Sequence, residues 1–256
     1  MEIIDIIKPD KQKLKTYYFR PQDAYKYILI VCHGFRGTKE NSGKIYSFAG
    51  RLNQLGFGVA AFDFSGSGES DGSFDDITLS GQAKDLCQVI DYMYKKYNKP
   101  IILLGRSFGG STVLAGGAAD KRIAGYIFWS TPVKMQETFA RMLDEDYEQL
   151  LKGKTINLID EVGEYTIKPD IIRDFDEHNM IKYLSALGNR PVLVIHGLED
   201  EVVDYSNAEE IKNYTQNSSI YLVEKAAHRF TNKTVEREDI TIRWLADRFV
   251  VDGGVD

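Results

Sequence analysis

The sequence has little cysteine or histidine, and neither type is grouped. Two cysteines, Cys32 and Cys87, and four histidines occur in 256 residues. Each cysteine lies in an apolar stretch, which favours two buried free thiols over a disulfide framework. The histidines are scattered and lack the spacing of metal ligands. We therefore expect neither a disulfide-stabilised scaffold nor a metal site.

Basic clusters and long apolar runs are also absent from the sequence. The formal net charge is −6, and acidic and basic residues are interspersed. Nucleic acids and anionic lipids would require a basic surplus on one face. No stretch approaches the roughly 18 apolar residues of a membrane span, and residues 1–8 are too short and acidic for a signal peptide. We expect a cytoplasmic protein without a nucleic-acid partner or membrane span, and a homodimer stays open.

From residue 26 onward, short apolar runs alternate with longer amphipathic segments. The runs predict strands at 27–32, 59–64, 101–104, 126–129, 192–195 and 220–223. The amphipathic segments predict helices at 46–55, 79–97, 108–119 and about 235–250. Nearly continuous apolar strands that alternate with helices are typical of an α/β fold with a mostly parallel central sheet flanked by helices. Residues 2–19 are expected to add an antiparallel edge.

Residues 133–190 interrupt this alternation. They carry many charges and dispersed aromatic residues, but no strong buried strand. The segment is too long for a simple crossover in a compact sheet. We expect residues 1–132 and 191–256 to form the core and residues 133–190 to form an inserted cap over one end of the sheet. An extra helix pair without a role at the site is the alternative.

One serine lies in a pattern that is typical of a catalytic nucleophile. Residues 105–109 read Gly-Arg-Ser-Phe-Gly, and Ser107 lies directly between a predicted strand and a predicted helix. Such a nucleophile elbow is so tight that its neighbours must be small, as Gly105 and Gly109 are. A second match to G-x-S-x-G, at residues 68–72, lies in a polar loop with no helix behind it. Ser107 is therefore the candidate nucleophile.

A serine hydroxyl becomes reactive when a histidine takes its proton and a carboxylate orients the histidine. After a nucleophile elbow the chain order is serine, acid, histidine. His228 follows the acid-bearing loop 196–204, in which Asp200 has the best spacing after the strand. The other carboxylates of this loop are expected to be solvated or to cap the next helix; they are Glu199, Glu201 and Asp204.

Acyl transfer also requires two N–H donors for the tetrahedral oxygen. One is expected from the backbone of Phe108, which follows the nucleophile. The other is expected from Phe35 in the sequence His33-Gly34-Phe35, directly after the predicted strand 27–32. The Phe35 side chain would then help to shape an acyl pocket. A plain turn is the alternative reading of His33-Gly34.

Together these motifs resemble the α/β-hydrolase superfamily over roughly residues 25–250. The motifs that carry the resemblance are residues 33–35, 62–72, 105–110, 196–203 and 227–228. Within the superfamily the chain looks most like small bacterial carboxylesterases that include feruloyl (cinnamoyl) esterases. Those enzymes carry a comparable insertion over the acyl pocket, and often have His and Gln where this sequence has Arg106 and Phe108.

The resemblance implies an α/β-hydrolase fold and hydrolysis of a small-molecule ester through an acyl-enzyme, without a cofactor. Short-chain or aromatic, feruloyl-type esters are the expected substrates. A thioesterase, a monoacylglycerol lipase or a peptidase would use the same three side chains. The alternative of another class is a protein of this fold that binds a ligand without turning it over.

Overall fold

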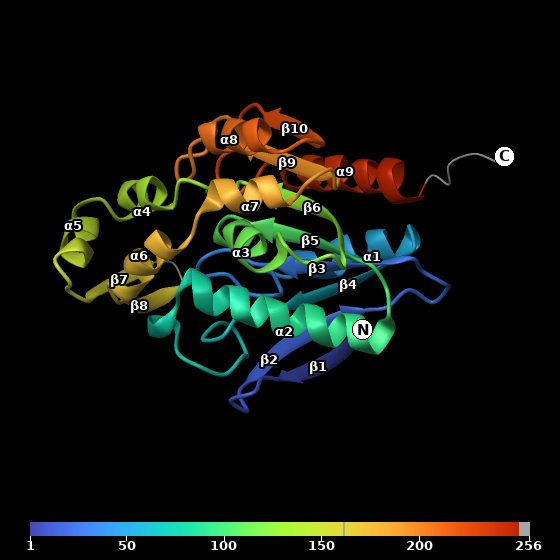
Figure 1. Cartoon of the computed structure of the whole chain (residues 1–256), viewed down its shortest axis with the longest axis horizontal. Coiled ribbons are helices and arrows are strands. Elements are labelled where there is room, and N and C mark those ends of the chain that lie inside the picture. The colour runs from blue at the N-terminus through green and yellow to red at the C-terminus, as the bar shows by residue number, and fades with distance from the viewer. Residues whose placement is uncertain (161, 251–256) are drawn as a thin grey trace.

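The computed structural model of the chain describes residues 1–160 and 162–250. In this part of the chain the central sheet has eight strands in the order β1-β2-β4-β3-β5-β6-β9-β10 (Figure 1). Their bounds are β1 Glu2–Ile7, β2 Lys13–Phe19, β3 Tyr27–Cys32, β4 Phe57–Phe62, β5 Ile101–Arg106, β6 Ile123–Trp129, β9 Val192–Gly197 and β10 Ser218–Val223. From β4 to β10 the neighbours pair parallel, whereas β1 and β2 form an antiparallel edge. The predicted sheet and its edge are confirmed.

Helices cover both faces of the sheet because its inner strands are apolar on both sides. In β3, Ile28 and Ile30 join one apolar cluster while Leu29, between them, joins the other. This alternation follows from the two-residue period of a strand. The helices on the first face include α2 (Leu79–Tyr97), α3 (Phe108–Gly117) and α8 (Ser206–Tyr214), and those on the second are α1 (Lys44–Gln54) and α9 (Thr234–Leu245).

The bounds of α2 agree with the predicted helix 79–97. Thr78 caps its first turn, since the Thr78 hydroxyl accepts a hydrogen bond from the N–H of Gly81. The helix ends at Asn98, whose φ of 49° is left-handed, two residues before Pro100. Strand β4 begins and ends earlier than the predicted 59–64, because its pairing with β3 stops at Phe62. The residues at its two ends therefore determine the bounds of α2, whereas pairing with β3 determines where β4 ends.

Residues 133–190 form a group of short elements. Those at 135–177 lie beside one end of the sheet, and the helix at 180–186 packs on α3 and α8 (Figure 1). The elements are α4 Met135–Leu143, α5 Glu145–Leu151, β7 Ile156–Asp160, β8 Gly163–Ile167, α6 Asp170–Asp174, the 3-10 helix Phe175–Glu177 and α7 Met180–Ala186. The antiparallel pair β7–β8 had no signal in the sequence, because this hairpin is largely exposed and Ile159 is 75% exposed. The hairpin also contacts a 3-10 helix, η1 (Phe74–Asp76), of the core.

The two cysteines differ in their surroundings. Both are free thiols, and Cys32 is buried in the sheet as expected. The expectation of full burial is wrong for Cys87, which is half-buried on α2 and donates its thiol to the carbonyl oxygen of Gly116 on α3. Within the described ranges, every helix is too short or too polar to cross a membrane.

Candidate active site

Ser107 occupies the turn between β5 and α3. Its φ of 51° and ψ of −128° lie in a region that costs a non-glycine residue on the order of 1–3 kcal/mol. Two backbone hydrogen bonds hold the turn: the Ser107 N–H donates to the carbonyl of Trp129, and the Ser107 carbonyl accepts from the N–H of Gly110, each at 2.8 Å. The strained turn presents the hydroxyl at the carboxyl end of the sheet.

The neighbouring glycines leave no room for a side chain. A Cβ at Gly105 would lie 2.4 Å from the Cα of Gly110. A Cβ at Gly109 would lie 2.3 Å from the carbonyl oxygen of His33. These distances are shorter than any van der Waals contact, so the turn requires glycine at both positions.

His228 lies between Ser107 and Asp200. Its Nε2 is 3.0 Å from Oγ of Ser107, and its Nδ1 is 3.0 Å from both carboxylate oxygens of Asp200. The His228 side chain is 11% exposed, whereas the Asp200 side chain is fully buried. The structure thus brings together three residues that the sequence separates by up to 121 positions.

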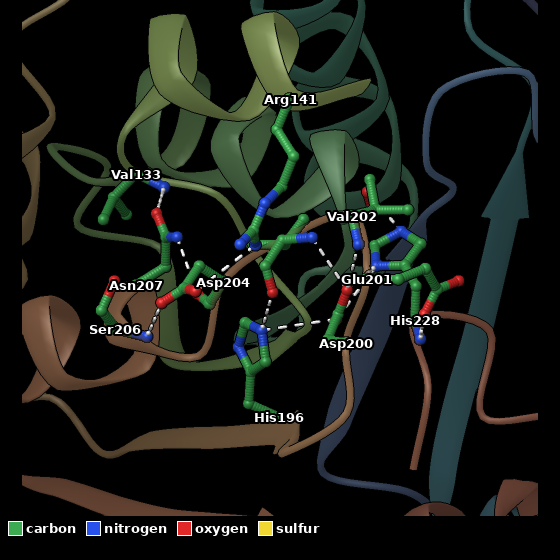
Figure 2. A network of polar contacts seen from close by, with 12 residues as sticks. Val133, Arg141, His196, Asp200, Glu201, Val202, Asp204, Ser206, Asn207 and His228 are labelled. Carbon is green, nitrogen blue, oxygen red and sulfur yellow. Dashed lines mark hydrogen bonds and ion pairs between the residues drawn. The ribbon is translucent and has the colours of Figure 1, made fainter. Parts of the chain in front are cut away.

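The Asp200 carboxylate is held by several donors in the loop after β9 (Figure 2). It accepts the N–H groups of Val202 and Val203, at 3.1 and 2.8 Å, and Nε2 of His196 lies 3.4 Å away. Burial alone would raise the pKa of Asp200, but hydrogen bonds from His196, His228 and Val203 hold it well below its usual range. Asp200 is therefore an anion at neutral pH.

Two other carboxylates of this loop, Asp204 and Glu201, accept hydrogen bonds from different parts of the chain. Asp204 is partly exposed and accepts the N–H of Ser206 at 3.0 Å, whereas the residue at the N-cap of α8 is Tyr205 (Figure 2). Glu201 is exposed, as expected, and its Oε2 also accepts the backbone N–H of His228 at 3.0 Å. The sequence carried no signal for this contact, because it joins two loops that are distant in the chain.

The loop after β3 lies directly against Ser107. A Cβ at Gly34 would approach the Cβ of Ser107 to 3.1 Å. His33 stabilises this loop, since its Nδ1–H donates to the Gly34 carbonyl at 2.8 Å and its Nε2 accepts the N–H of Phe64 at 3.2 Å. Burial lowers the pKa of His33, so its imidazole remains neutral in this role.

Phe35 and Phe108 are the two expected donors for an oxyanion. Phe108 is the first residue of α3, where a helix leaves its N–H groups unpaired. Phe35 lies in the loop that contacts Ser107. In the part of the chain that the structure describes, neither backbone N–H donates to a protein acceptor. Both are therefore free to bind a substrate oxygen.

An aromatic cluster lies beside these donors and joins the core to the inserted segment. The Phe139 ring on α4 lies 5.6 Å from the Phe35 ring and 5.7 Å from the Phe108 ring, measured between centroids. Phe175 lies 4.8 Å from Phe139 in an edge-to-face contact. The sequence identified Phe35 as part of a pocket, but it contained no periodic pattern that placed Phe139 and Phe175 there.

The sheet order and the strand–Ser107–helix turn define an α/β hydrolase of the serine hydrolase and esterase type. A comparison with protein families matches residues 23–182 to the family described as "Serine aminopeptidase, S33", and the chain belongs to this family. Residues 136–256 also match a family of secretory lipases. The resemblance to the α/β-hydrolase superfamily is therefore confirmed.

Relatives of the chain include a thioesterase and a protein without a described function. The human palmitoyl-protein thioesterase ABHD10, mitochondrial, is 24% identical over 226 residues, which cover 83% of this chain and 72% of that protein. An uncharacterised 31.7 kDa protein of Escherichia coli is 34% identical over 107 residues, which cover 40% of this chain and 37% of that protein. The second match thus spans little more than a third of that relative.

Solved structures share the fold over nearly the whole chain. Est1E from Butyrivibrio proteoclasticus with ferulic acid bound has a TM-score of 0.83 at 24% identity, covering 96% of this chain and 98% of that chain. Mouse ABHD10 has a TM-score of 0.76 at 20% identity, covering 96% of this chain and 98% of that chain. These likenesses confirm the fold class that the sequence predicts.

Proposed function

We propose that the chain is a serine hydrolase that cleaves a carboxylic ester through an acyl-enzyme. Ser107 is the nucleophile, His228 the general base and Asp200 the carboxylate that orients the imidazole. One observation carries the proposal: each nitrogen of the His228 ring lies 3.0 Å from one of these two partners. This is the geometry that proton transfer from a serine hydroxyl requires.

In the proposed cycle, Oγ of Ser107 attacks the ester carbonyl carbon while Nε2 of His228 accepts the hydroxyl proton. The charge of Asp200 stabilises the imidazolium, and the N–H groups of Phe35 and Phe108 bind the oxyanion. His228 then donates its proton to the leaving alkoxide as the ester C–O bond breaks. Water attacks the acyl-enzyme in the same way, and the carboxylic acid is released.

The aromatic cluster supports a substrate that carries an apolar acyl group. The rings of Phe35, Phe108 and Phe139 pack against one another, and Phe108 directly follows Ser107 in the chain. Apolar sites lined by such rings bind aliphatic or aromatic groups. Residues 133–190 would act as the cap that excludes water from this pocket. The fold shared with Est1E, which was solved with ferulic acid, supports short or aromatic acyl groups as the first candidates.

Thioester hydrolysis is the second candidate. It is favoured by the match to a palmitoyl-protein thioesterase over 83% of this chain. The attack on the carbonyl would be the same, but the leaving group would be a thiolate. An aminopeptidase, as the family description suggests, would instead release an amine.

A substrate panel tests the proposal. It contains p-nitrophenyl esters of rising chain length, methyl ferulate, an acyl-CoA and an aminoacyl anilide, each assayed with wild type and Ser107→Ala. We expect ester turnover by wild type and a loss of at least about 10³-fold in Ser107→Ala. The matched control is Ser70→Ala, which changes the other G-x-S-x-G match and should keep turnover.

Two results would count against this function. Turnover in Ser107→Ala equal to that of wild type would remove Ser107 from the reaction. A wild-type protein that neither hydrolyses any panel member nor reacts with a fluorophosphonate would support ligand binding without catalysis. A preference for acyl-CoA over every oxygen ester would favour the thioesterase.

A further inference from the structure

Arg36 connects the loop that carries Phe35 to the hairpin β7–β8 of the inserted segment. Its Nε donates to Oδ2 of Asp160 at 3.1 Å, and its Nη2 donates to Oδ1 at 2.9 Å and to the Gly163 carbonyl at 3.0 Å. Asp160 ends β7 and Gly163 begins β8. One guanidinium therefore binds both strands of the hairpin through the two-pronged geometry that arginine forms with a carboxylate.

Arg36 also contacts the hairpin through an aromatic ring. Its guanidinium carbon lies 4.2 Å from the centroid of the Tyr165 ring on β8, a distance typical of a cation–π contact. The Tyr165 ring in turn lies 6.2 Å from the ring of Phe35. The neighbours Phe35 and Arg36 therefore both contact the inserted segment.

The rest of this loop is attached to the core. At its start, His33 bonds to the backbone of Phe64. At its end, Lys39 donates its backbone N–H to Asp63 at 2.6 Å and its ammonium group to the same carboxylate at 2.8 Å. The middle of the loop, where Phe35 offers its N–H, contacts the core through the Phe74 ring, 5.1 Å from the Phe35 ring, and its polar contacts are those of Arg36 with the hairpin.

We propose that Arg36 is a positioning residue for the oxyanion hole, and that its bond to Asp160 makes hydrolysis depend on the docked hairpin. This inference rests on the proposed function. An oxyanion donor is effective only when it is fixed in place before charge develops, within about 0.5 Å of the productive position. Without the Asp160 contact, the Phe35 amide would sample several positions, and transition-state stabilisation would fall more than substrate binding.

The test compares kcat and KM of four variants on the ester that wild type hydrolyses best. They are Arg36→Gln, Arg36→Lys, Asp160→Asn and the double variant of Arg36→Gln with Asp160→Asn. We expect kcat to fall about tenfold in Arg36→Gln and in Asp160→Asn, equivalent to about 1.4 kcal/mol, with KM changed less than about threefold. The double variant should lose less than the product of the two single losses, because both single variants remove the bond between Arg36 and Asp160.

Two further comparisons separate positioning from general stabilisation. Arg36→Lys should be intermediate, since lysine keeps the charge but lacks the planar fork. The control is Lys168→Gln, which removes another ion pair between the inserted segment and the core, Lys168–Asp76 at 2.6 Å, and should keep wild-type kcat. Added salt should lower kcat of wild type but not of Asp160→Asn, because it screens a partly exposed ion pair.

The possible results are distinguishable. Wild-type kcat in both Arg36→Gln and Asp160→Asn, with Ser107→Ala inactive, would overturn the role of Arg36 and leave the proposed function intact. An equal loss in Lys168→Gln would also overturn it, since any loosening of the inserted segment would then suffice. Full activity of Ser107→Ala would reject the proposed function itself. If Arg36→Gln does not fold, Asp160→Asn decides, because it leaves the oxyanion loop unchanged.

Discussion

At the scale of single residues, the charge of Asp200 determines which nitrogen of His228 carries a proton. A buried carboxylate that remains ionised must receive hydrogen bonds, and Asp200 receives them from His228 and two backbone amides, with Nε2 of His196 3.4 Å away. An anion at this position favours the proton on Nδ1 of His228. The lone pair of Nε2 then faces the hydroxyl of Ser107, as a general base requires.

The substitution Asp200→Asn tests this dependence. The amide would present an N–H or a weaker acceptor to His228, so the imidazole would favour the tautomer with its proton on Nε2. We expect kcat/KM to fall about 10³- to 10⁴-fold while the protein still folds. Ester kinetics and circular dichroism measure the two effects. Glu199→Gln, an exposed neighbour, is the control, and a comparable loss there would show that the loop rather than the charge matters.

How far these residues could be predicted depends on how local their signals are. Ser107 could be proposed as the nucleophile because a strand, a small-residue turn and a helix are contiguous around it. Asp200 and His228 followed from chain order and from their positions after strands. Arg36 and Asp160 are 124 residues apart, and neither lies in a pattern that refers to the other. A pairing of this kind arises only when the fold brings two loops together.

At the scale of elements, a polar cluster around His178 attaches the inserted segment to the core. The cluster contains a histidine, a serine and an acid, the residue types of a catalytic site. Nε2 of His178 lies 2.9 Å from Oγ of Ser80 on α2 and 3.3 Å from Asp174 on α6, and its Nδ1 lies 3.1 Å from the hydroxyl of Tyr183 on α7. The acid and the serine share one ring nitrogen, so the imidazole cannot relay a proton between them. The cluster therefore joins helices.

We expect His178→Ala to weaken this junction without removing the reaction. The lost hydrogen bonds to Ser80 and Tyr183 should reduce the free energy of unfolding by about 1–3 kcal/mol. Denaturant titration measures this loss, and fluorophosphonate labelling of Ser107 measures the reactivity that should remain. A variant of normal stability that no longer labels would contradict the assignment, because it would give His178 a chemical role.

The hairpin β7–β8 should respond to acid through Asp160. The hydrogen bonds from Arg36 lower the pKa of Asp160 to about 2, from an unfolded value of about 3.9. A lowered carboxyl pKa contributes stability that is present above the unfolded value and is lost as pH falls through the folded value. The contribution should therefore be constant above about pH 5 and disappear towards pH 2.

The measurement is the difference in unfolding midpoint between wild type and Asp160→Asn at several pH values. We expect wild type to be more stable above pH 5 and the two proteins to converge as the pH approaches 2. A difference that stays constant throughout, or that has already vanished at pH 6, would show that the carboxylate charge is not what stabilises the hairpin.

At the scale of the whole molecule, the inserted segment and the core share one apolar cluster. Phe139 and Phe175 are 2% exposed, and they pack with Phe108 of the core in the same cluster that covers one face of the sheet. From the sequence, these rings were only dispersed aromatics between charged residues. Their burial depends on the core surface that they cover, which no local pattern describes.

Because the cluster is shared, we expect core and inserted segment to unfold in a single transition. Phe139→Ala should cost about 3–5 kcal/mol and lower the midpoint of the entire transition by about 10 °C, since a domain of this size shifts by about 2–4 °C per kcal/mol. Calorimetry reports both parts, and the fluorescence of Trp129 in β6 and Trp244 in α9 reports the core. Calorimetry could instead show a separate early transition whose midpoint falls in Phe139→Ala while the tryptophan fluorescence transition stays unchanged. That result would mean that the inserted segment unfolds independently. Hydrolysis would then depend on a docking equilibrium rather than on the global stability of the fold.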